Sequence, residues 1–317
     1  MKAAVIRRFS QPYELADVPV PRPGPGECLV RVRATGICRT DLKISAGVFA
    51  TPLPIIPGHE VAGELAEDAG DMRRGQRVAI HGFLPCGTCR WCRLGEETLC
   101  PDPPRTGFNR DGGLAEYLVA PIRCAVPFAD TLSFASAAVG MDAVVSPWRA
   151  LTVRAKVKPG ESVVVVGAGG LGLSALQIAI ASGAQVAAVD PVDSHRQEAL
   201  RLGAEVAVDP ARAEELLDWS QGGADVVYEG SGSRQGLDTA ARLITPGGRL
   251  ICNGWVPEAE YGLQSRQLVL KEISVIGSRS GTRADVAAVL RALERGQVKP
   301  TVEMARLDDI NDVMSRL

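Results

Sequence analysis

The sequence predicts an α/β protein with two domains, a β-rich N-terminal domain followed by a doubly wound domain built on a parallel sheet. Three observations predict this class. The chain has 317 residues, which is more than one hydrophobic core usually supports. Its first part is rich in Pro and Gly and contains short alternating segments. From about residue 145, strand-like apolar runs instead alternate with helical segments, as expected of βαβ units.

In the first part, strands are expected where apolar and polar residues alternate between turns such as residues 23–26. Four segments fit this pattern, at residues 2–6, 28–34, 61–65 and 76–80. We therefore expect a compact, mostly β domain at the N-terminus.

In the second part, residues 162–166 form a continuous apolar run, which is typical of a parallel strand buried on both faces. A helix is expected at residues 171–182, and a final long helix at 284–295. Further strands are expected at residues 185–189, 206–208, 226–228, 249–252 and 273–277. This alternation predicts a doubly wound sheet.

The composition excludes several classes of protein. With 46% hydrophobic and 23% charged residues, the chain has the composition of an ordinary globular protein. A net charge of −2 offers no basic field for nucleic acid. No apolar run reaches the roughly 18–20 residues of a membrane span, and residues 1–20 lack the features of a signal peptide. We expect a cytoplasmic protein without a nucleic-acid or membrane partner.

Half of the eight cysteines gather within fifteen residues, at Cys86, Cys89, Cys92 and Cys100. Clustered thiols in a cytosolic protein indicate a metal site more often than disulfides. Four thiolates can close a tetrahedral shell around zinc with no position left for water, which predicts a structural zinc lobe at residues 86–100. Iron–sulfur ligation is the alternative, since similar runs bind clusters.

A glycine-rich turn follows the predicted strand at residues 162–166 and begins the next helix. Glycines at such a turn let the backbone approach a pyrophosphate, which binds at the positive end of the helix. The alternative is a glycine turn that has only a structural role and binds no ligand. The residues that fit the dinucleotide fingerprint are Gly167, Gly169, Gly170, Leu171 and Gly172.

Asp190 ends the second predicted strand of this domain, where a carboxylate would bind both ribose hydroxyls of a dinucleotide. The same carboxylate would repel the 2′-phosphate of NADP, and its neighbour Pro191 carries no charge. The position therefore favours NAD. Arg196 could still reach the adenosine ribose, so the preference for NAD need not be absolute.

Taken together, the motifs resemble those of the medium-chain zinc-dependent alcohol dehydrogenases. The segments that carry the resemblance are residues 36–41 (Gly-Ile-Cys-Arg-Thr-Asp), residues 58–60 (Gly-His-Glu), the four-cysteine lobe and the glycine turn. They occur in that family's order and spacing over nearly the whole chain.

The resemblance implies a division of the chain into domains. It implies a GroES-like catalytic domain at residues 1–144, a Rossmann domain at 145–281, and a return to the catalytic domain at 282–317. Family members normally continue past the equivalent of Leu317 into a closing strand, so this return is expected to be short.

The resemblance also assigns a catalytic zinc site to Cys38 and His59. The family's third ligand is usually a cysteine, but this chain has Asp142 at that position, as in some secondary-alcohol dehydrogenases. Zinc accepts carboxylate oxygen readily, and one thiolate, one imidazole and one carboxylate keep the centre neutral. Glu60 matches a family glutamate that can approach the metal. If Asp142 only caps the following segment, Glu60 could complete the shell instead.

The implied activity is hydride transfer between an alcohol and NAD, with two zinc ions per chain and zinc acting as a Lewis acid. Thr40 resembles the family's proton-accepting hydroxyl, and Arg39 its pyrophosphate contact. Lys43 stands where many relatives have a relay histidine, which leaves the exit of the proton open.

Three alternatives to an alcohol substrate remain at this stage. They are a polyol or sugar dehydrogenase of the same family, a zinc-independent reductase, and a non-catalytic relative that binds a dinucleotide. The expected edge strand at residues 273–277 resembles the one through which relatives pair their sheets. It therefore favours a homodimer or a homotetramer.

Overall fold

The computed structural model describes residues 1–257, 260 and 262–317, and the chain divides into two compact units. Unit 1 comprises Met1–Asp142, Gly281–Arg295 and Thr301–Leu317, and unit 2 comprises Ala143–Ser280 and Gly296–Pro300. Residues 296–300, which we expected with the C-terminal return, group with unit 2. The side-chain oxygen of Gln177 in this unit accepts a 2.8 Å hydrogen bond from the Lys299 amide.

Unit 1 is built on a five-stranded antiparallel sheet with the strand order β6-β3-β4-β5-β7. Its inner side chains, among them Val30, Val61, Val78 and Leu118, form one buried apolar core. The strands are β3 (Glu27–Gly36), β4 (Glu60–Leu65), β5 (Arg77–Ile80), β6 (Tyr117–Pro121) and β7 (Ala125–Pro127).

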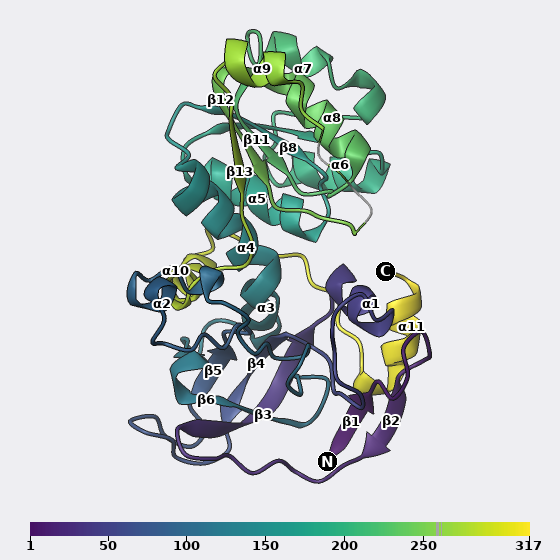
Figure 1. Ribbon diagram of the computed structural model, residues 1–317, viewed down its shortest axis with the longest axis vertical. Helices are drawn as coiled ribbons and strands as arrows, with labels where there is room; N and C mark the ends of the chain where they lie inside the picture. The colour runs from purple at the N-terminus through teal and green to yellow at the C-terminus, as the bar shows by residue number, and fades with distance from the viewer. Residues whose placement is uncertain (258–259, 261) are drawn as a thin grey trace. The chain divides into compact units, whose positions relative to one another are not determined.

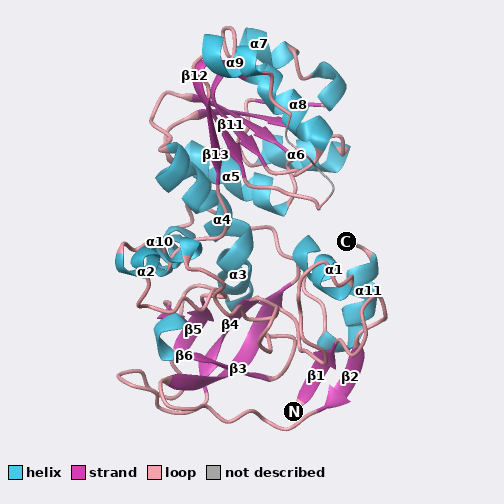
Figure 2. Cartoon of the chain, viewed as in Figure 1, coloured by secondary structure: helices cyan, strands magenta, loops and turns pink. Residues whose placement is uncertain are grey.

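A second layer of unit 1 joins the two ends of the chain. The strands β1 (Lys2–Val5) and β2 (Glu14–Asp17) pair antiparallel, and Figure 2 shows α1 (Arg39–Ser45) and α11 (Ile310–Ser315) beside them. The Asn311 side chain accepts from the Tyr13 amide and donates to the Tyr13 carbonyl. These bonds fix α11 to the segment that begins β2.

The remaining helices of unit 1 are short, apart from α10. They are α2 (Arg90–Arg93), α3 (Phe134–Val139) and α10 (Arg283–Glu294), with the 3₁₀ turns η1 (Glu97–Leu99), η2 (Ile122–Cys124) and η6 (Leu307–Asp309).

Unit 2 contains a six-stranded sheet in which every neighbouring pair is parallel, with the order β10-β9-β8-β11-β12-β13. This is the order of a doubly wound dinucleotide-binding fold, whose strand order reverses between β8 and β11. The strands are β8 (Ser162–Val166), β9 (Gln185–Val189), β10 (Val206–Val208), β11 (Ala224–Glu229), β12 (Ile244–Cys252) and β13 (Ser274–Gly277).

Helices surround this sheet, as Figure 1 shows. Because crossovers between parallel strands are right-handed, α5 and α6 cover one face and α8 covers the other. The α8 face buries Val164, Val166, Val227 and Leu237 in one cluster. The helices of unit 2 are α4 (Val145–Trp148), α5 (Gly170–Ala181), α6 (Asp193–Arg201), α7 (Glu215–Trp219), α8 (Arg234–Leu243) and α9 (Ser265–Leu270), with the π-helix η4 (Arg149–Ala155) and the 3₁₀ turn η5 (Pro210–Arg212).

The structure confirms the predicted fold class. The bounds of β8, β9 and β10 are those expected from the sequence, and α5 and α10 lie within one residue of the expected helices. The sequence analysis missed β2, β6, β7 and α11. Three of the four residues of β2 are exposed and β7 has only three residues, so neither leaves an alternating apolar pattern long enough to detect.

Candidate active site

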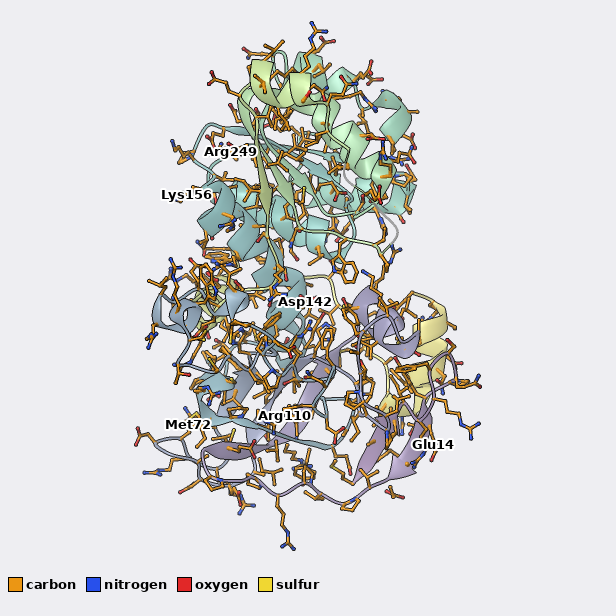
Figure 3. All side chains as sticks on the ribbon, viewed as in Figure 1. Glu14, Met72, Arg110, Asp142, Lys156 and Arg249 are labelled. Carbon is orange, nitrogen blue, oxygen red and sulfur yellow. The ribbon has the colours of Figure 1, made fainter. Side chains whose placement is uncertain are left out.

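Four potential metal ligands from distant parts of the sequence meet in unit 1. Cys38, His59, Glu60 and Asp142 each offer one ligand atom, and these atoms lie within 4.8 Å of one another. Cys38 caps α1, His59 and Glu60 lie at the start of β4, and Asp142, labelled in Figure 3, lies in the π-helix η3 (Gly140–Val144) that continues α3. A π-helical turn is rare and is frequent at functional sites.

The separations among three of these ligands suit zinc. Cys38 Sγ lies 3.4 Å from His59 Nε2 and 3.7 Å from Asp142 Oδ2, and His59 Nε2 lies 3.7 Å from Asp142 Oδ2. Zinc bonds of about 2.0–2.3 Å in a tetrahedron place ligand atoms roughly 3.3–3.8 Å apart. The three atoms are therefore spaced as three zinc ligands would be, and an ion held by them would have a fourth position open for substrate.

Asp41, to which the sequence analysis assigned no role, lies against two of these ligands. Its Oδ2 accepts a 3.0 Å hydrogen bond from the Cys38 amide, and its Oδ1 lies 3.4 Å from His59 Nδ1. A carboxylate at Nδ1 leaves Nε2 as the metal-binding atom of the imidazole. The signal was present in the sequence, because an acid three residues after an N-cap residue is the pattern of a capping box.

Burial and negative charge shape the protonation of the site in the absence of metal. Burial alone lowers the pKa of His59, but the charges of Asp41 and Cys38 outweigh it, so that the pKa rises well above its usual value. Burial raises the pKa of the Cys38 thiol to about 11. A cation that replaces the thiol proton would relieve this cost, which is the usual coupling between metal binding and proton release.

Glu60 is almost completely buried, and it fills space that the glycine of the first motif leaves open. A Cβ atom on Gly36 would collide with the Glu60 carboxylate. Burial, followed by the nearby charge of Asp142, raises the pKa of Glu60 well above its usual value. Glu60 therefore ionises less readily than an exposed glutamate, whereas Cys38, His59 and Asp142 lie within 3.4–3.7 Å of one another.

The four cysteines of the predicted lobe also converge. Cys86, Cys89, Cys92 and Cys100 place their sulfur atoms within 4.8 Å of one another. Cys92 Sγ lies 3.5 Å from Cys89 Sγ and 3.9 Å from Cys86 Sγ. Four zinc–sulfur bonds of about 2.3 Å place the sulfurs roughly 3.8 Å apart, so the lobe fits a closed zinc site.

Backbone amides stabilise the thiolates of this lobe. Hydrogen bonds from the Thr88 and Cys89 amides lower the pKa of Cys86 to about 6. Cys89 Sγ likewise accepts from the Cys92 amide. The loop therefore favours the anionic form of Cys86, whereas burial raises the pKa of the Cys92 and Cys100 thiols.

The predicted dinucleotide turn lies at the carboxyl end of β8, beside the point where the strand order reverses. Gly167 has a left-handed φ of 87°, and a Cβ on Gly172 would collide with the Gly167 carbonyl. Gly169 and Gly170 have open space where a Cβ would point, and no side chain caps the N-terminus of α5. An uncapped helix N-terminus with an open glycine surface fits a pyrophosphate.

Asp190 lies close to this turn, although its carboxylate already has partners. Its Oδ2 accepts from the Ala168 amide at 2.7 Å, and its Oδ1 accepts from the Val192 amide at 2.8 Å. His195, which the sequence analysis did not identify, places Nδ1 3.2 Å from the same Oδ1. This network fixes the carboxylate next to the glycine turn.

Arg196 does not extend freely toward a ribose. Its guanidinium donates to the carbonyls of Asp190 and Pro191 and to the side chain of Asp193, and it lies 3.6 Å from Asp209. These contacts hold the guanidinium against its own loop. Direct binding of Arg196 to a dinucleotide stays a prediction.

A second buried acid organises the turn opposite the glycine motif. Glu229 ends β11, is fully buried, and accepts from the amides of Ser231 and Gly232. Burial raises its pKa, although these hydrogen bonds partly offset the effect. The turn packs closely on the glycine motif, since a Cβ on Gly167 would lie 2.8 Å from the Ser231 nitrogen. A buried acid followed by glycine after a predicted strand could have indicated this turn in the sequence.

The other predicted site residues lie on α1. The Thr40 amide donates to Cys38 Sγ at 3.2 Å, which places Thr40 beside the metal-ligand set. Arg39 is exposed and Lys43 is half-buried on the same helix. Their roles toward substrate and cofactor stay predictions. In the described part of the chain, no helix is both long enough and apolar enough to cross a membrane.

Comparison with known proteins agrees with this geometry. Residues 24–130 match the alcohol dehydrogenase GroES-like domain, and residues 170–295 match the zinc-binding dehydrogenase domain. An alcohol dehydrogenase of Geobacillus stearothermophilus is 37% identical over 326 residues, covering 100% of this chain and 96% of that protein.

Two further alcohol dehydrogenases resemble the chain over its whole length. An NAD-dependent alcohol dehydrogenase of Sulfurisphaera tokodaii is 31% identical, covering 100% of this chain and 96% of that protein. The structure of a cobalt- and zinc-bound thermostable alcohol dehydrogenase from Pyrobaculum aerophilum matches with a TM-score of 0.92 at 32% identity, covering 100% of this chain and 95% of that one.

The chain therefore belongs to the zinc-binding alcohol dehydrogenase family. Both the predicted resemblance and the predicted combination of a GroES-like and a Rossmann domain are confirmed. The match to the zinc-binding dehydrogenase domain, together with the two candidate metal sites, supports zinc as a cofactor of this chain.

Proposed function

We propose that this protein oxidises a primary or secondary alcohol with NAD, and reduces the corresponding aldehyde or ketone in the reverse direction. The observation that carries the proposal is the arrangement of Cys38, His59 and Asp142, whose mutual distances of 3.4–3.7 Å fit three corners of a zinc tetrahedron. The names of the relatives, which include NAD-dependent alcohol dehydrogenases, support the reaction type.

Zinc in this site would supply a Lewis acid that favours the deprotonated form of the alcohol. The chain's own contribution is a rigid donor set with two negative charges. The Cys38 thiolate and the Asp142 carboxylate would balance the two charges of the ion, and Asp41 Oδ1 faces His59 Nδ1 at 3.4 Å. Such preorganisation matters because a misplacement of about 1 Å can cost roughly 100-fold in rate.

We further propose that the Thr40 hydroxyl accepts the alcohol proton. Thr40 follows the ligand Cys38 by two residues and is tied to it through the amide hydrogen bond to Sγ, so its position relative to the metal site is fixed. Lys43 lies one helical turn further along α1. A lysine can pass on a proton only if its pKa is lowered, and the route beyond Thr40 stays open.

NAD would bind at the glycine turn of unit 2. The N-terminus of α5 would hold the pyrophosphate, and Asp190 would bind the adenosine ribose through its carboxylate. The carboxylate would also disfavour the 2′-phosphate of NADP. The second zinc ion would occupy the four-cysteine lobe, where the closed donor set gives it a structural role. Assembly into a homodimer or a homotetramer stays a prediction, although β13 does form an edge of its sheet.

The first test is to count zinc in protein purified without chelators and then to assay a panel of alcohols with NAD and NADP. We expect close to two zinc ions per chain, alcohol-dependent formation of NADH, and a lower kcat/KM with NADP. A panel that includes polyols separates this proposal from a sugar dehydrogenase. Protein with two zinc ions that reduces NAD with none of these substrates would contradict the proposal.

A further inference from the structure

A histidine lies beside the carboxylate that would bind the adenosine ribose. His195 Nδ1 lies 3.2 Å from Asp190 Oδ1. One short turn holds both groups, because the Val192 amide donates to the Asp190 side chain and the Val192 carbonyl accepts from the His195 amide. The Asp190 side chain is only 7% exposed, whereas that of His195 is 41% exposed. A ribose bound by Asp190 would therefore lie next to an accessible imidazole ring.

The contact with Asp190 also fixes which ring nitrogen carries the proton. A carboxylate accepts hydrogen bonds and donates none, so the proton of the neutral ring lies on Nδ1. His195 Nε2 has no hydrogen-bond partner among the residues that the structure describes. The neutral ring thus presents a lone pair at Nε2, which accepts from a ribose hydroxyl. The protonated ring presents a charged N–H at the same place, which donates to a phosphate.

The other charges around this turn are mostly negative. The Arg196 guanidinium lies 2.8 Å from Asp193 and 3.6 Å from Asp209, and it donates to the Asp190 carbonyl. Three carboxylates, including that of Asp190, are therefore offset by one guanidinium. With His195 neutral, the turn carries a net negative charge that repels a 2′-phosphate, and protonation of the ring brings the turn close to neutrality.

The elements packed against α6 contribute no further charge. They are β9, β10 and α5, which the structure describes completely and which contain no charged residue. The remaining charged residues of α6, Glu198 and Arg201, pair with each other at 2.6 Å. Histidine is the side chain that ordinarily changes its charge between about pH 5 and pH 8. His195 is thus the group that sets the pH dependence of charge at this turn.

We propose that His195 makes the choice between NAD and NADP depend on pH. This inference rests on the proposed function, because it concerns the same dinucleotide site. When the ring is neutral, His195 and Asp190 bind the ribose hydroxyls of NAD, and the carboxylate repels the 2′-phosphate of NADP. When the ring is protonated, it pairs with Asp190 and donates from Nε2 to the 2′-phosphate, so the site accepts NADP as well.

The test measures the dissociation constants (Kd) of NAD and NADP by isothermal titration calorimetry at pH 6 and pH 8, at one ionic strength and without alcohol. We expect the ratio of the Kd for NADP to the Kd for NAD to be about tenfold lower at pH 6. The reason is that protonation adds a charge-assisted hydrogen bond for NADP alone. Adenosine 2′,5′-bisphosphate and 5′-AMP should show the same shift, since they differ only in the 2′-phosphate.

Three variants isolate the contribution of the ring. His195→Gln stays neutral, so its ratio should change much less with pH, and any residual shift reports the phosphate itself, whose second pKa is about 6. His195→Lys carries a positive charge at both pH values and should give a low ratio at both. Arg201→Gln changes a charge of α6 that pairs away from the turn, and it should keep the dependence of the wild type.

The outcomes distinguish this inference from the proposed function. A ratio that is equal at the two pH values in the wild type, or that falls by as much in His195→Gln, would overturn the role of His195 and leave NAD-dependent alcohol oxidation standing. A high ratio at both pH values in His195→Lys would overturn it as well. Failure of both dinucleotides to bind would overturn the proposed function and the inference with it.

Discussion

The two candidate zinc sites of unit 1 are built in opposite ways. The cysteine lobe takes all four ligands from residues 86–100, near the surface, and Cys86 is exposed. The second site takes its ligands from positions 38, 59 and 142, and His59 and Glu60 are buried. One site is a local loop, whereas the other requires the sheet, α1 and the helix after α3 to be in place.

We expect this difference to correspond to a structural and a catalytic role. Four thiolates around one zinc ion would leave no position for a substrate. The other site combines three close donors with a supporting acid, Asp41, and an aromatic neighbour, Phe108. Placing an open site on packed elements holds its geometry fixed, which catalysis needs more than binding does.

The strongest test of the difference between the two sites removes one ligand from each. Asp142→Ala should leave about one zinc per chain and lower kcat/KM by at least roughly 1,000-fold, since the metal contributes several kcal/mol of transition-state stabilisation. Asp142→Cys should restore zinc binding, because a thiolate carries the same charge. Zinc content and alcohol-dependent NADH formation measure both effects.

The matched change in the lobe is Cys89→Ser. It should also remove one zinc, but it should act mainly on stability, lowering the thermal midpoint by several degrees with a much smaller change in turnover. Unchanged turnover in Asp142→Ala would rule out Asp142 as a catalytic ligand. A loss of turnover in Cys89→Ser as large as that in Asp142→Ala would show that the two sites do not differ in role.

The thiols of the two sites should differ in reactivity once the metal is removed. The pKa of Cys86 is lowered to about 6 and that of Cys38 is raised to about 11, so at pH 7 Cys86 is mostly thiolate whereas only about one Cys38 in 10,000 is ionised. Allowing for the weaker nucleophilicity of a low-pKa thiolate, iodoacetamide should modify Cys86 about 100-fold faster.

Peptide mass spectrometry of chelator-treated protein over a range of pH would measure this contrast. The rate at Cys86 should level off above pH 7, whereas the rate at Cys38 should keep rising about tenfold per pH unit toward pH 10, because only its thiolate reacts. Zinc-loaded protein serves as the control and should be protected at both positions. Equal rates at pH 7 would show that burial does not distinguish the two sites.

A smaller effect should follow from the acid that supports His59. Asp41→Asn keeps the size of the side chain but removes its charge, and we expect a loss of about 10- to 100-fold in zinc affinity or activity, as is typical for partners of metal-ligating histidines. Zinc titration with a competing chelator would measure it. Tyr13→Phe, which removes a hydroxyl near the Asp41 carbonyl, is the control and should change zinc affinity much less. No difference between the two variants would mean that the carboxylate does not support His59.

The sequence alone predicted most of the parallel sheet, because strands buried on both faces are continuous apolar runs. The bounds of β8, β9 and β10 follow directly from Ser162–Val166, Gln185–Val189 and Val206–Val208. The local sites were predicted equally well, since cysteine spacing defines a lobe within one loop and glycines define a turn.

Tertiary structure decided the features that depend on neighbours distant in sequence. Asp41 belongs to a motif that the sequence analysis recognised, but only the fold places its Oδ1 beside His59. His195 and Arg196 are neighbours in sequence. His195 contacts the carboxylate of Asp190, whereas Arg196 donates to its backbone carbonyl.

The sequence by itself therefore determined the fold class and the family, and it predicted the metal ligands. Spacing and periodicity are local properties, and the chain carries them before it folds. Tertiary structure decided which residues contact those ligands. Those roles arise from packing between segments far apart in the chain. There, burial and distances of a few ångströms decide how strongly a charge acts and which group it contacts.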